Sequence, residues 1–184
     1  MKLDLSFWTN ASSKRKRIYS IIIIFILAFI ITVIGSYIPL SHQDAQTLSN
    51  GVNATLNAHK SFGSRTEFIF FNNFFEVCLP MFVPIIGLIW GFLVMGNTGL
   101  ALGAISSVQG YPVWIELLSL VLTPVFWLEF AAYSTAMAEG IWLTRRLMQR
   151  RWLELKNTAM LIGICAAILI VSAIIEVWLI AVLG

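Results

Sequence analysis

Charged side chains are scarce in this chain. Asp, Glu, Lys and Arg together make up 11% of its 184 residues, whereas 59% are hydrophobic and the mean hydropathy is +0.86. A soluble globule of this size needs more polar surface than that. Residues 18–40 carry no charge and exceed the roughly 7–15 apolar residues of a signal peptide. The composition therefore predicts an integral membrane protein that retains its first span.

Histidine and cysteine are also nearly absent. Both histidines, His42 and His59, lie in a polar segment, whereas Cys78 and Cys165 lie within apolar stretches. The chain has no His-x-x-x-His pair and no Gly-x-Ser-x-Gly nucleophile turn. We therefore expect no enzymatic activity, no metal and no cofactor, and we expect the cysteines to be small buried hydrophobic residues.

The twelve basic residues fall into three groups: five in 2–17, two in 41–67 and five in 145–156. Loops rich in Lys and Arg stay cytoplasmic. This rule predicts that the N-terminus and the 145–156 loop face the cytoplasm. Topology and attraction to anionic lipid explain both clusters, so we expect the lipid bilayer as a partner and no nucleic acid. The residues expected at the lipid headgroups are Lys14, Arg15, Lys16, Arg17, Arg145, Arg146, Arg150 and Arg151.

The apolar stretches predict an all-α polytopic helix bundle in the cell membrane, with one membrane domain over 1–184. About five spans are expected, which places the C-terminus outside. The segment 41–66 is expected as an outer loop, irregular or weakly helical. The expected spans are 18–38, 68–95 with a kink or break at Pro80 and Pro84, a short or re-entrant 98–110, 112–144 kinked at Pro124, and 157–183.

Five glutamates lie inside the apolar stretches, and no lysine or arginine shares those stretches with them. A carboxylate in hydrocarbon is unfavourable by about 2.5 kcal/mol or more, so each one needs a reason. Three explanations stay open: the carboxylates carry protons or cations, they hydrogen-bond between helices, or they lie at wet interfaces. The glutamates are Glu76, Glu116, Glu129, Glu139 and Glu176, of which Glu116 and Glu139 are expected near an interface.

Helical spacing places several of these carboxylates in polar stripes. Glu76 follows Asn72 by four residues, and Tyr133 follows Glu129 by the same spacing, so each pair shares a helix face. This spacing puts the tyrosine hydroxyl within reach of the carboxyl. We expect a polar membrane core made of Asn72, Asn73, Glu76, Asn97, Pro124, Glu129 and Tyr133, with Glu76 and Glu129 as its centre.

Small residues repeat at four-residue spacing and predict close contacts between helices. They suggest tight packing over 72–140, with the first and last spans more peripheral. The predicted packing residues are Gly87, Gly91, Gly99, Gly103, Ala132, Ala136 and Gly140.

Residues 65–145 resemble the stage II sporulation protein M family. The residues that carry the resemblance are Phe71-Asn72-Asn73, Gly87 to Gly91, Asn97-Thr98-Gly99 with Gly103, Pro124 to Glu129, and Glu139-Gly140. Two positions depart from the family pattern: Val125-Phe126 replace a His-Gly pair, and Thr98 splits an Asn-Gly pair. The resemblance implies a multi-pass α-helical protein without known enzymatic activity. In spore formers, the family is similar to a scaffold that holds a membrane-anchored cell-wall-degrading enzyme and a partner.

The sequence thus predicts a non-enzymatic integral membrane protein that scaffolds or organises other membrane or cell-envelope proteins, or that self-associates. Two alternatives remain. One is a small transporter or channel that uses Glu76, Glu116 and Glu129. The other is an accessory subunit of a larger membrane enzyme complex.

Overall fold

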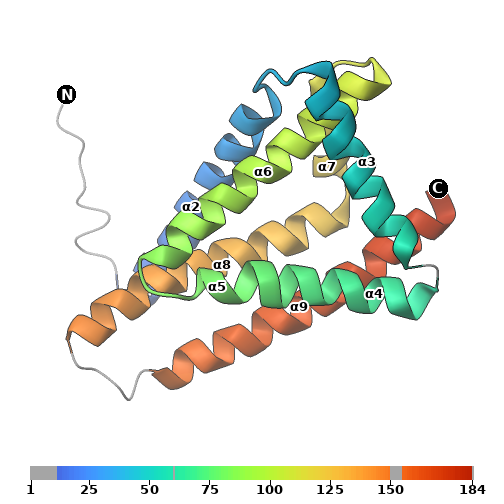
Figure 1. Ribbon diagram of the computed structural model, residues 1–184. Helices are drawn as coiled ribbons and strands as arrows, with labels where there is room; N and C mark the ends of the chain where they lie inside the picture. The colour runs from blue at the N-terminus through green and yellow to red at the C-terminus, as the bar shows by residue number, and fades with distance from the viewer. Residues whose placement is uncertain (1–11, 60, 150–154, 184) are drawn as a thin grey trace, which may run out of the picture.

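The computed structural model describes residues 12–59, 61–149 and 155–183, and every regular element in these ranges is a helix (Figure 1). The predicted all-α class is confirmed. The elements are α2 (Ser13–Ser36), α3 (His42–Ala58), α4 (Phe62–Phe71), the π-helix η1 (Asn72–Cys78), α5 (Leu79–Met81), α6 (Ile86–Gln109), α7 (Val113–Leu122), α8 (Pro124–Met148) and α9 (Leu155–Leu183).

Three helices of the described ranges are long and apolar enough to cross a membrane: Lys14–Ser36, Ile86–Gln109 and Lys156–Val182. A fourth candidate is the pair α7 and α8, which meet at an angle of 82°. These helices fit the predicted membrane protein. The number of spans and the sides of the two termini remain predictions.

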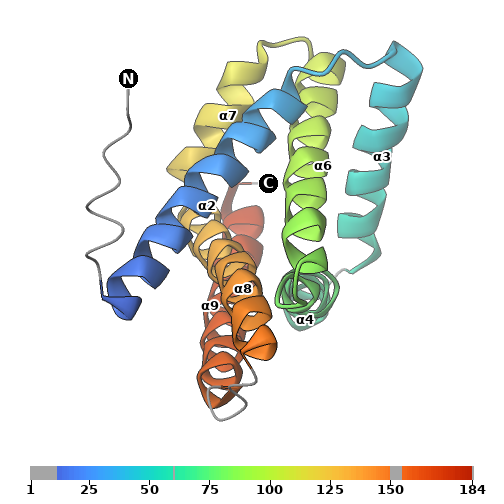
Figure 2. The ribbon, with the colours of Figure 1, turned by 90° about the vertical axis from the view of Figure 1, so that its left-hand side faces the viewer.

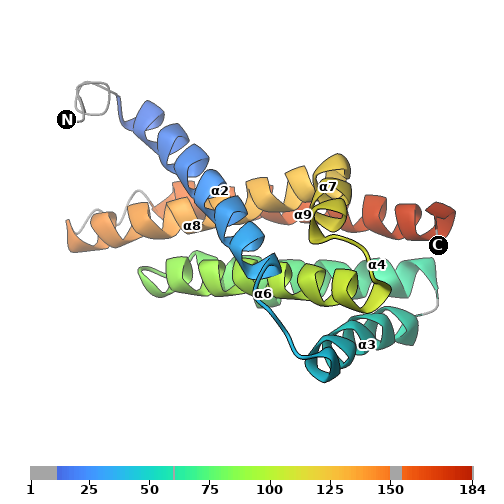
Figure 3. The ribbon, with the colours of Figure 1, turned by 90° about the horizontal axis from the view of Figure 1, so that it is seen from above.

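The helices run in two main directions. In Figures 1 and 3, the axes of α8, α9 and the rod formed by α4, η1 and α5 run nearly parallel to one another. Figure 2 shows α4 and α8 nearly end-on, while α2 and α6 rise away from them. The rod and α9 are antiparallel, because Ile69 packs against Ala173 and Val177, whereas Cys78 lies against Cys165.

Small residues bring the backbones of α2 and α6 into direct contact. A Cβ atom on Gly99 would lie 2.1 Å from the carbonyl oxygen of Thr32, and one on Gly103 would lie 2.5 Å from that of Ser36. Gly35 of α2 faces the backbone of α6 in the same way. The Thr32 hydroxyl donates to the Met95 carbonyl at 3.2 Å. Sequence reasoning identified the glycines of α6 but missed Gly35 and its polar neighbours, and it placed the first span at the periphery.

The other predicted packing residues also lie between elements. Cβ atoms on Gly87 and Gly140 would lie 2.2 and 2.8 Å from the carbonyl oxygen of Met81, and one on Gly91 would lie 2.2 Å from Met137 Sδ. Ala132 and Ala136 are fully buried. This end of the bundle therefore packs around Met81, where α5 ends.

The predicted span 68–95 is divided in two. The chain leaves the helix after Met81 and turns through 82–85 before α6 begins. Pro84 supplies no N–H for a continuing helix, and Ile85 has a φ of 64° and a ψ of −57°, with a 2.7 Å hydrogen bond from Ile86 N to Pro84 O. This γ-turn conformation is rare and strained for a β-branched residue. Two helices therefore diverge from one corner, where one span with a kink or a break was expected.

The predicted short element 98–110 is instead the second half of α6. The sequence Gly96-Asn97-Thr98-Gly99 looked like a break, but α6 is continuous through it. The Thr98 hydroxyl bonds back to the Val94 carbonyl at 3.0 Å, and Gly99 lies against α2. The close contact outweighs the low helix propensity of glycine, which destabilises a helix by about 1 kcal/mol per residue relative to alanine. Gly110, with a φ of 78°, then ends the helix in the left-handed conformation.

The segment 41–66, expected as an irregular or weakly helical outer loop, is largely helical. Ser41 caps α3, because its hydroxyl accepts from Asp44 N and donates to the Asp44 carboxylate at 2.6 Å. Ala45 and Ser49, one turn apart, are buried, and α3 packs along α6. The small polar residues that suggested a loop are the residues that let α3 approach its neighbour.

A substitution at Gly99 tests the α2–α6 contact. Gly99→Ala is expected to lower the free energy of unfolding by about 1–3 kcal/mol, because the added methyl group overlaps the Thr32 carbonyl. Gly163→Ala on α9 is the matched control, since nothing lies within 4 Å of its Cβ position. Unfolding by SDS in mixed micelles measures both. Equal stability of the two variants would contradict the contact.

Candidate functional site

One polar site inside the bundle forms around Glu129 of α8. Its Oε1 accepts a hydrogen bond from Asn73 Nδ2 of η1 at 2.6 Å and one from Ser172 Oγ of α9 at 3.5 Å. Glu176, one turn beyond Ser172, is close enough to Glu129 to interact with it electrostatically. One carboxylate therefore links three helices that are distant in the sequence.

A cavity of about 190 Å³ lies beside this carboxylate. Its walls combine apolar side chains from α6, α7 and α8 with five polar residues. The polar lining residues are Asn72, Asn73, Thr98, Glu129 and Tyr133. Four of these were predicted from the sequence. Among the described residues the hydrogen bonds of Glu129 go to Asn73 and Ser172, whereas the sequence suggested Tyr133.

Glu76 does not join this site. Its side chain is exposed on the outside of η1, while Asn73 and Cys78 face inward. Glu76 follows the buried Ile69 by seven residues, a spacing that shares one face of an α-helix. The π-helix has wider turns, with i to i+5 hydrogen bonds, so a residue seven positions after Ile69 no longer points to the same side as Ile69. The expectation that Glu76 and Asn72 form one inward stripe therefore does not hold for the structure.

Two further members of the predicted polar core also lie elsewhere. Asn97 is exposed on α6, and Pro124 is exposed at the first position of α8. Pro124 acts on the site indirectly: it begins α8 after the 82° bend and thereby sets the direction in which Glu129 is presented. Ser172 was missed, because serine in an apolar helix gives no sign of which face it occupies.

A second buried carboxylate, Glu139, forms an ion pair. Arg146 Nη1 donates to Glu139 Oε1 at 2.6 Å and to Thr158 Oγ1 at 3.1 Å, and Thr158 Oγ1 donates to the same carboxylate at 2.7 Å. Glu139 and Arg146 are only 2% and 4% exposed. The sequence placed Arg146 at the lipid headgroups and Glu139 at a wet interface, and it assigned no cation to the glutamates. The i, i+7 spacing on one helix was the signal for this pair.

Glu116 lies in the first turn of α7. It accepts hydrogen bonds from the hydroxyl of Tyr111 and from Ser119 Oγ at 3.3 Å. Both partners are local, and Glu116 is partly exposed. A carboxylate at this position also interacts favourably with the helix N-terminus. The geometry does not bring Glu116 together with Glu129.

The two basic clusters meet at one end of the bundle. The guanidinium carbon of Arg17 lies 5.9 Å from the centre of the Trp142 ring, and that of Arg145 lies 5.7 Å from it. Lys14 and Arg15 are exposed, and Lys16 is partly exposed. Arg150 and Arg151 lie outside the described residues. One tryptophan thus joins cations that are more than a hundred residues apart.

The Glu129 site can bind a proton or a small cation, because it offers one carboxylate, an amide and a hydroxyl. Within 12–59, 61–149 and 155–183, no group of three His, Cys, Asp or Glu residues is placed to hold a metal ion. His59 instead stacks on Phe68 and bonds Ser64 at 3.0 Å. Cys78 and Cys165 are free thiols and are buried.

Arg146→Leu tests the Glu139 ion pair. Removal of one partner leaves a buried charge without its counter-ion, which is expected to lower the free energy of unfolding by about 3–5 kcal/mol. The double variant with Glu139→Leu is expected to be more stable than Arg146→Leu alone. Arg145→Leu, at an exposed neighbour, is the control. Additive losses in SDS-induced unfolding would argue against coupling of the two side chains.

No protein-family model, curated protein or solved structure matches this chain. The resemblance to the stage II sporulation protein M family therefore stays a prediction from the motifs.

Proposed function

We propose that this protein is a multi-pass membrane scaffold that organises other membrane or cell-envelope proteins, similar to the stage II sporulation protein M family. The N-terminus and the basic end of the bundle face the cytoplasm, and the C-terminus lies outside. One observation carries the proposal: the Glu76 carboxylate is exposed on the outer face of η1.

The depth of Glu76 makes its exposure informative. In the sequence it lies between Asn73 and Cys78. Asn73 and Ser172 donate hydrogen bonds to the same Glu129 carboxylate, and Cys78 lies against Cys165. Glu76 is therefore level with about residues 165–172 of α9, the middle of the candidate span Lys156–Val182. A carboxylate that meets lipid at this depth is strongly disfavoured. A partner that covers Glu76 removes this penalty.

The surface around Glu76 suits a partner helix. Phe71 and Phe75 are 52% and 45% exposed, and their rings stack with centroids 4.8 Å apart. Together, Phe71, Phe75 and Glu76 form what we call the η1 face. Rigid aromatic side chains and one hydrogen-bonding group are typical of protein interfaces. The partner is a membrane protein whose helix presents a donor, such as an amide, a hydroxyl or a cation, opposite Glu76.

Photo-crosslinking tests the η1 face. Benzoylphenylalanine in place of Phe75 is expected to link this chain to a different membrane protein in native membranes, whereas the same amino acid at the exposed Trp114 of α7 is the control. Glu76→Leu is expected to reduce the product about 3- to 30-fold, the value of one interhelical hydrogen bond. Glu67→Leu, at an exposed carboxylate near the start of α4, is the matched control.

Three outcomes would count against the scaffold. Equal crosslinking at positions 75 and 114 would mean that the η1 face is not a specific surface. A product that contains only this chain would assign the face to self-association. No effect of Glu76→Leu would remove the observation on which the proposal depends.

Proton or cation transport is the second candidate, and the Glu129 cavity favours it. Its volume of about 190 Å³ is large enough for several waters, and polar residues from η1, α6 and α8 line it. Intramembrane carboxylates beside water-filled cavities form proton relays in transporters. Against this, the described hydrogen bonds of Glu129 tie it to Asn73 and Ser172, which suits a structural link between helices.

Flux measurements separate the two candidates. If the protein is a scaffold, purified protein in vesicles with a pH gradient is expected to pass no more protons than protein-free vesicles, as read by a pH-sensitive dye. Flux that Glu129→Gln abolishes and Glu76→Gln preserves would replace the scaffold by a transporter. The pair is matched, since both changes remove one carboxylate but only Glu129 lines the cavity.

A further inference from the structure

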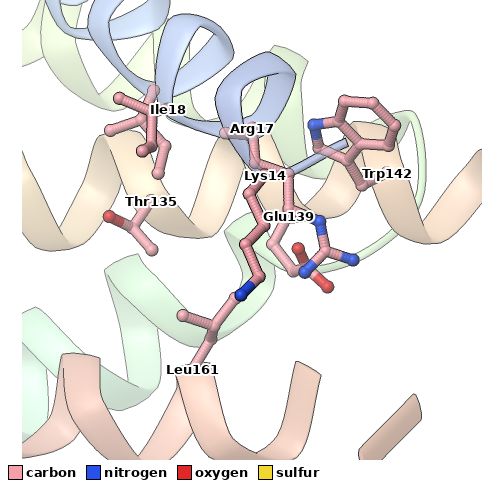
Figure 4. Close-up of a pocket in the computed structure, with 9 residues that line it drawn as sticks. Lys14, Arg17, Ile18, Thr135, Glu139, Trp142 and Leu161 are labelled. Carbon is pink, nitrogen blue, oxygen red and sulfur yellow. The ribbon is translucent and has the colours of Figure 1, made fainter. Parts of the chain in front are cut away.

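A second cavity, of about 230 Å³, opens at the basic end of the bundle between α2, α8 and α9. Figure 4 shows side chains from these three helices converging on it, with Lys14 and Arg17 extending from α2 toward Leu161 of α9 and Glu139 of α8. No other residue in either basic cluster lines it within the described ranges. The cavity is separate from the Glu129 site, with which it shares no lining residue.

The walls of this cavity are divided by polarity. Four aliphatic side chains, Ile18, Ile21, Ala138 and Leu161, form its apolar wall, and Lys14 and Arg17 add two cations. A small-molecule site would normally be enclosed and about 300–1,000 Å³ in volume. A smaller space with cations beside an aliphatic wall instead suits one end of an amphipathic molecule whose remainder lies in the bilayer.

The charge of the cavity is positive. Its one acidic lining residue, Glu139, pairs with Arg146 at 2.6 Å, so the two cations Lys14 and Arg17 leave the cavity with a net positive charge. Arg145 adds a third cation at the Trp142 ring. The buried indole N–H of Trp142 has no hydrogen-bond acceptor among the described residues, and an acceptor oxygen from a ligand would satisfy it.

We propose that this cavity binds one anionic phospholipid. The phosphate lies between Lys14 and Arg17, and the first carbons of an acyl chain lie against Ile18, Ile21 and Leu161. The lipid comes from the leaflet at the basic end of the bundle. The proposed topology places this end at the cytoplasmic leaflet, which carries the anionic lipids. This site differs from general attraction of a basic segment to a membrane, because only two residues of the first cluster line it.

Native mass spectrometry tests the site. The protein is released from vesicles that contain equal amounts of phosphatidylglycerol and phosphatidylcholine, and retained lipids are counted. Wild-type protein is expected to keep one phosphatidylglycerol preferentially. The pair Lys14→Gln and Arg17→Gln is expected to weaken retention about 30-fold, the effect of two cations near an anionic headgroup.

The matched control is the pair Arg15→Gln and Lys16→Gln. It removes the same charge from the same turn of α2 but changes no residue of the cavity, so retention is expected to stay within about twofold of wild type. Equal losses in the two pairs would overturn the proposal in favour of general surface attraction. Thermal unfolding of each variant shows whether it is folded.

Two measurements on wild-type protein decide the proposal without any variant. A lack of preference for phosphatidylglycerol over phosphatidylcholine would overturn it. So would displacement of the lipid by millimolar inorganic phosphate, because this would show that a free anion suffices and that the apolar wall contributes nothing. Retention of the lipid in phosphate supports the site.

Discussion

A polar group inside a bilayer must find its hydrogen-bond partner within protein, because hydrocarbon offers none. This constraint explains where Glu129 and Glu139 lie. Glu129 joins Asn73 and Ser172, and Glu139 joins Arg146 and Thr158. Each of these two carboxylates connects α8 to α9. The polar groups that make the chain unusual for a membrane protein thus also hold its second half together.

Close packing of α2 against α6 places the basic residues of α2 at one end of the molecule. Backbone contacts at Gly35 and Gly99 fix α2 against α6, and α2 in turn carries Lys14 and Arg17 to Trp142 of α8. The described residues of the two basic clusters therefore gather at one end of the bundle, as expected for a protein oriented by its positive charges. The cavity lined by Lys14 and Arg17 and the η1 face lie on different helices, so the two proposals assign a lipid and a partner protein to separate surfaces.

The sequence predicted the helical class, helices long and apolar enough to cross a membrane, and the small residues at helix contacts, because these depend on composition and on local periodicity. It failed where tertiary contacts override local preference. Residues Gly96 to Gly99 suggested a break but are part of the continuous helix α6, where Gly99 contacts α2. The polar residues after Ser41 form α3. Of the two proposed central carboxylates, only Glu129 faces inward. The π-helix that turns Glu76 outward has no simple sequence signal, because it depends on how the helix packs.

The seven residues of η1 also determine the directions in which the side chains of η1 and α5 point, up to the turn at 82–85. A π-helical turn accommodates one more residue than an α-helical turn, so the loss of one residue here would rotate the remainder of the rod by about 100°. Glu76 and the buried Cys78 would both turn away from the faces they now occupy, without any change in the chemistry of either side chain. The length of this segment, and not its composition alone, decides which carboxylate lies on the outer face of the bundle.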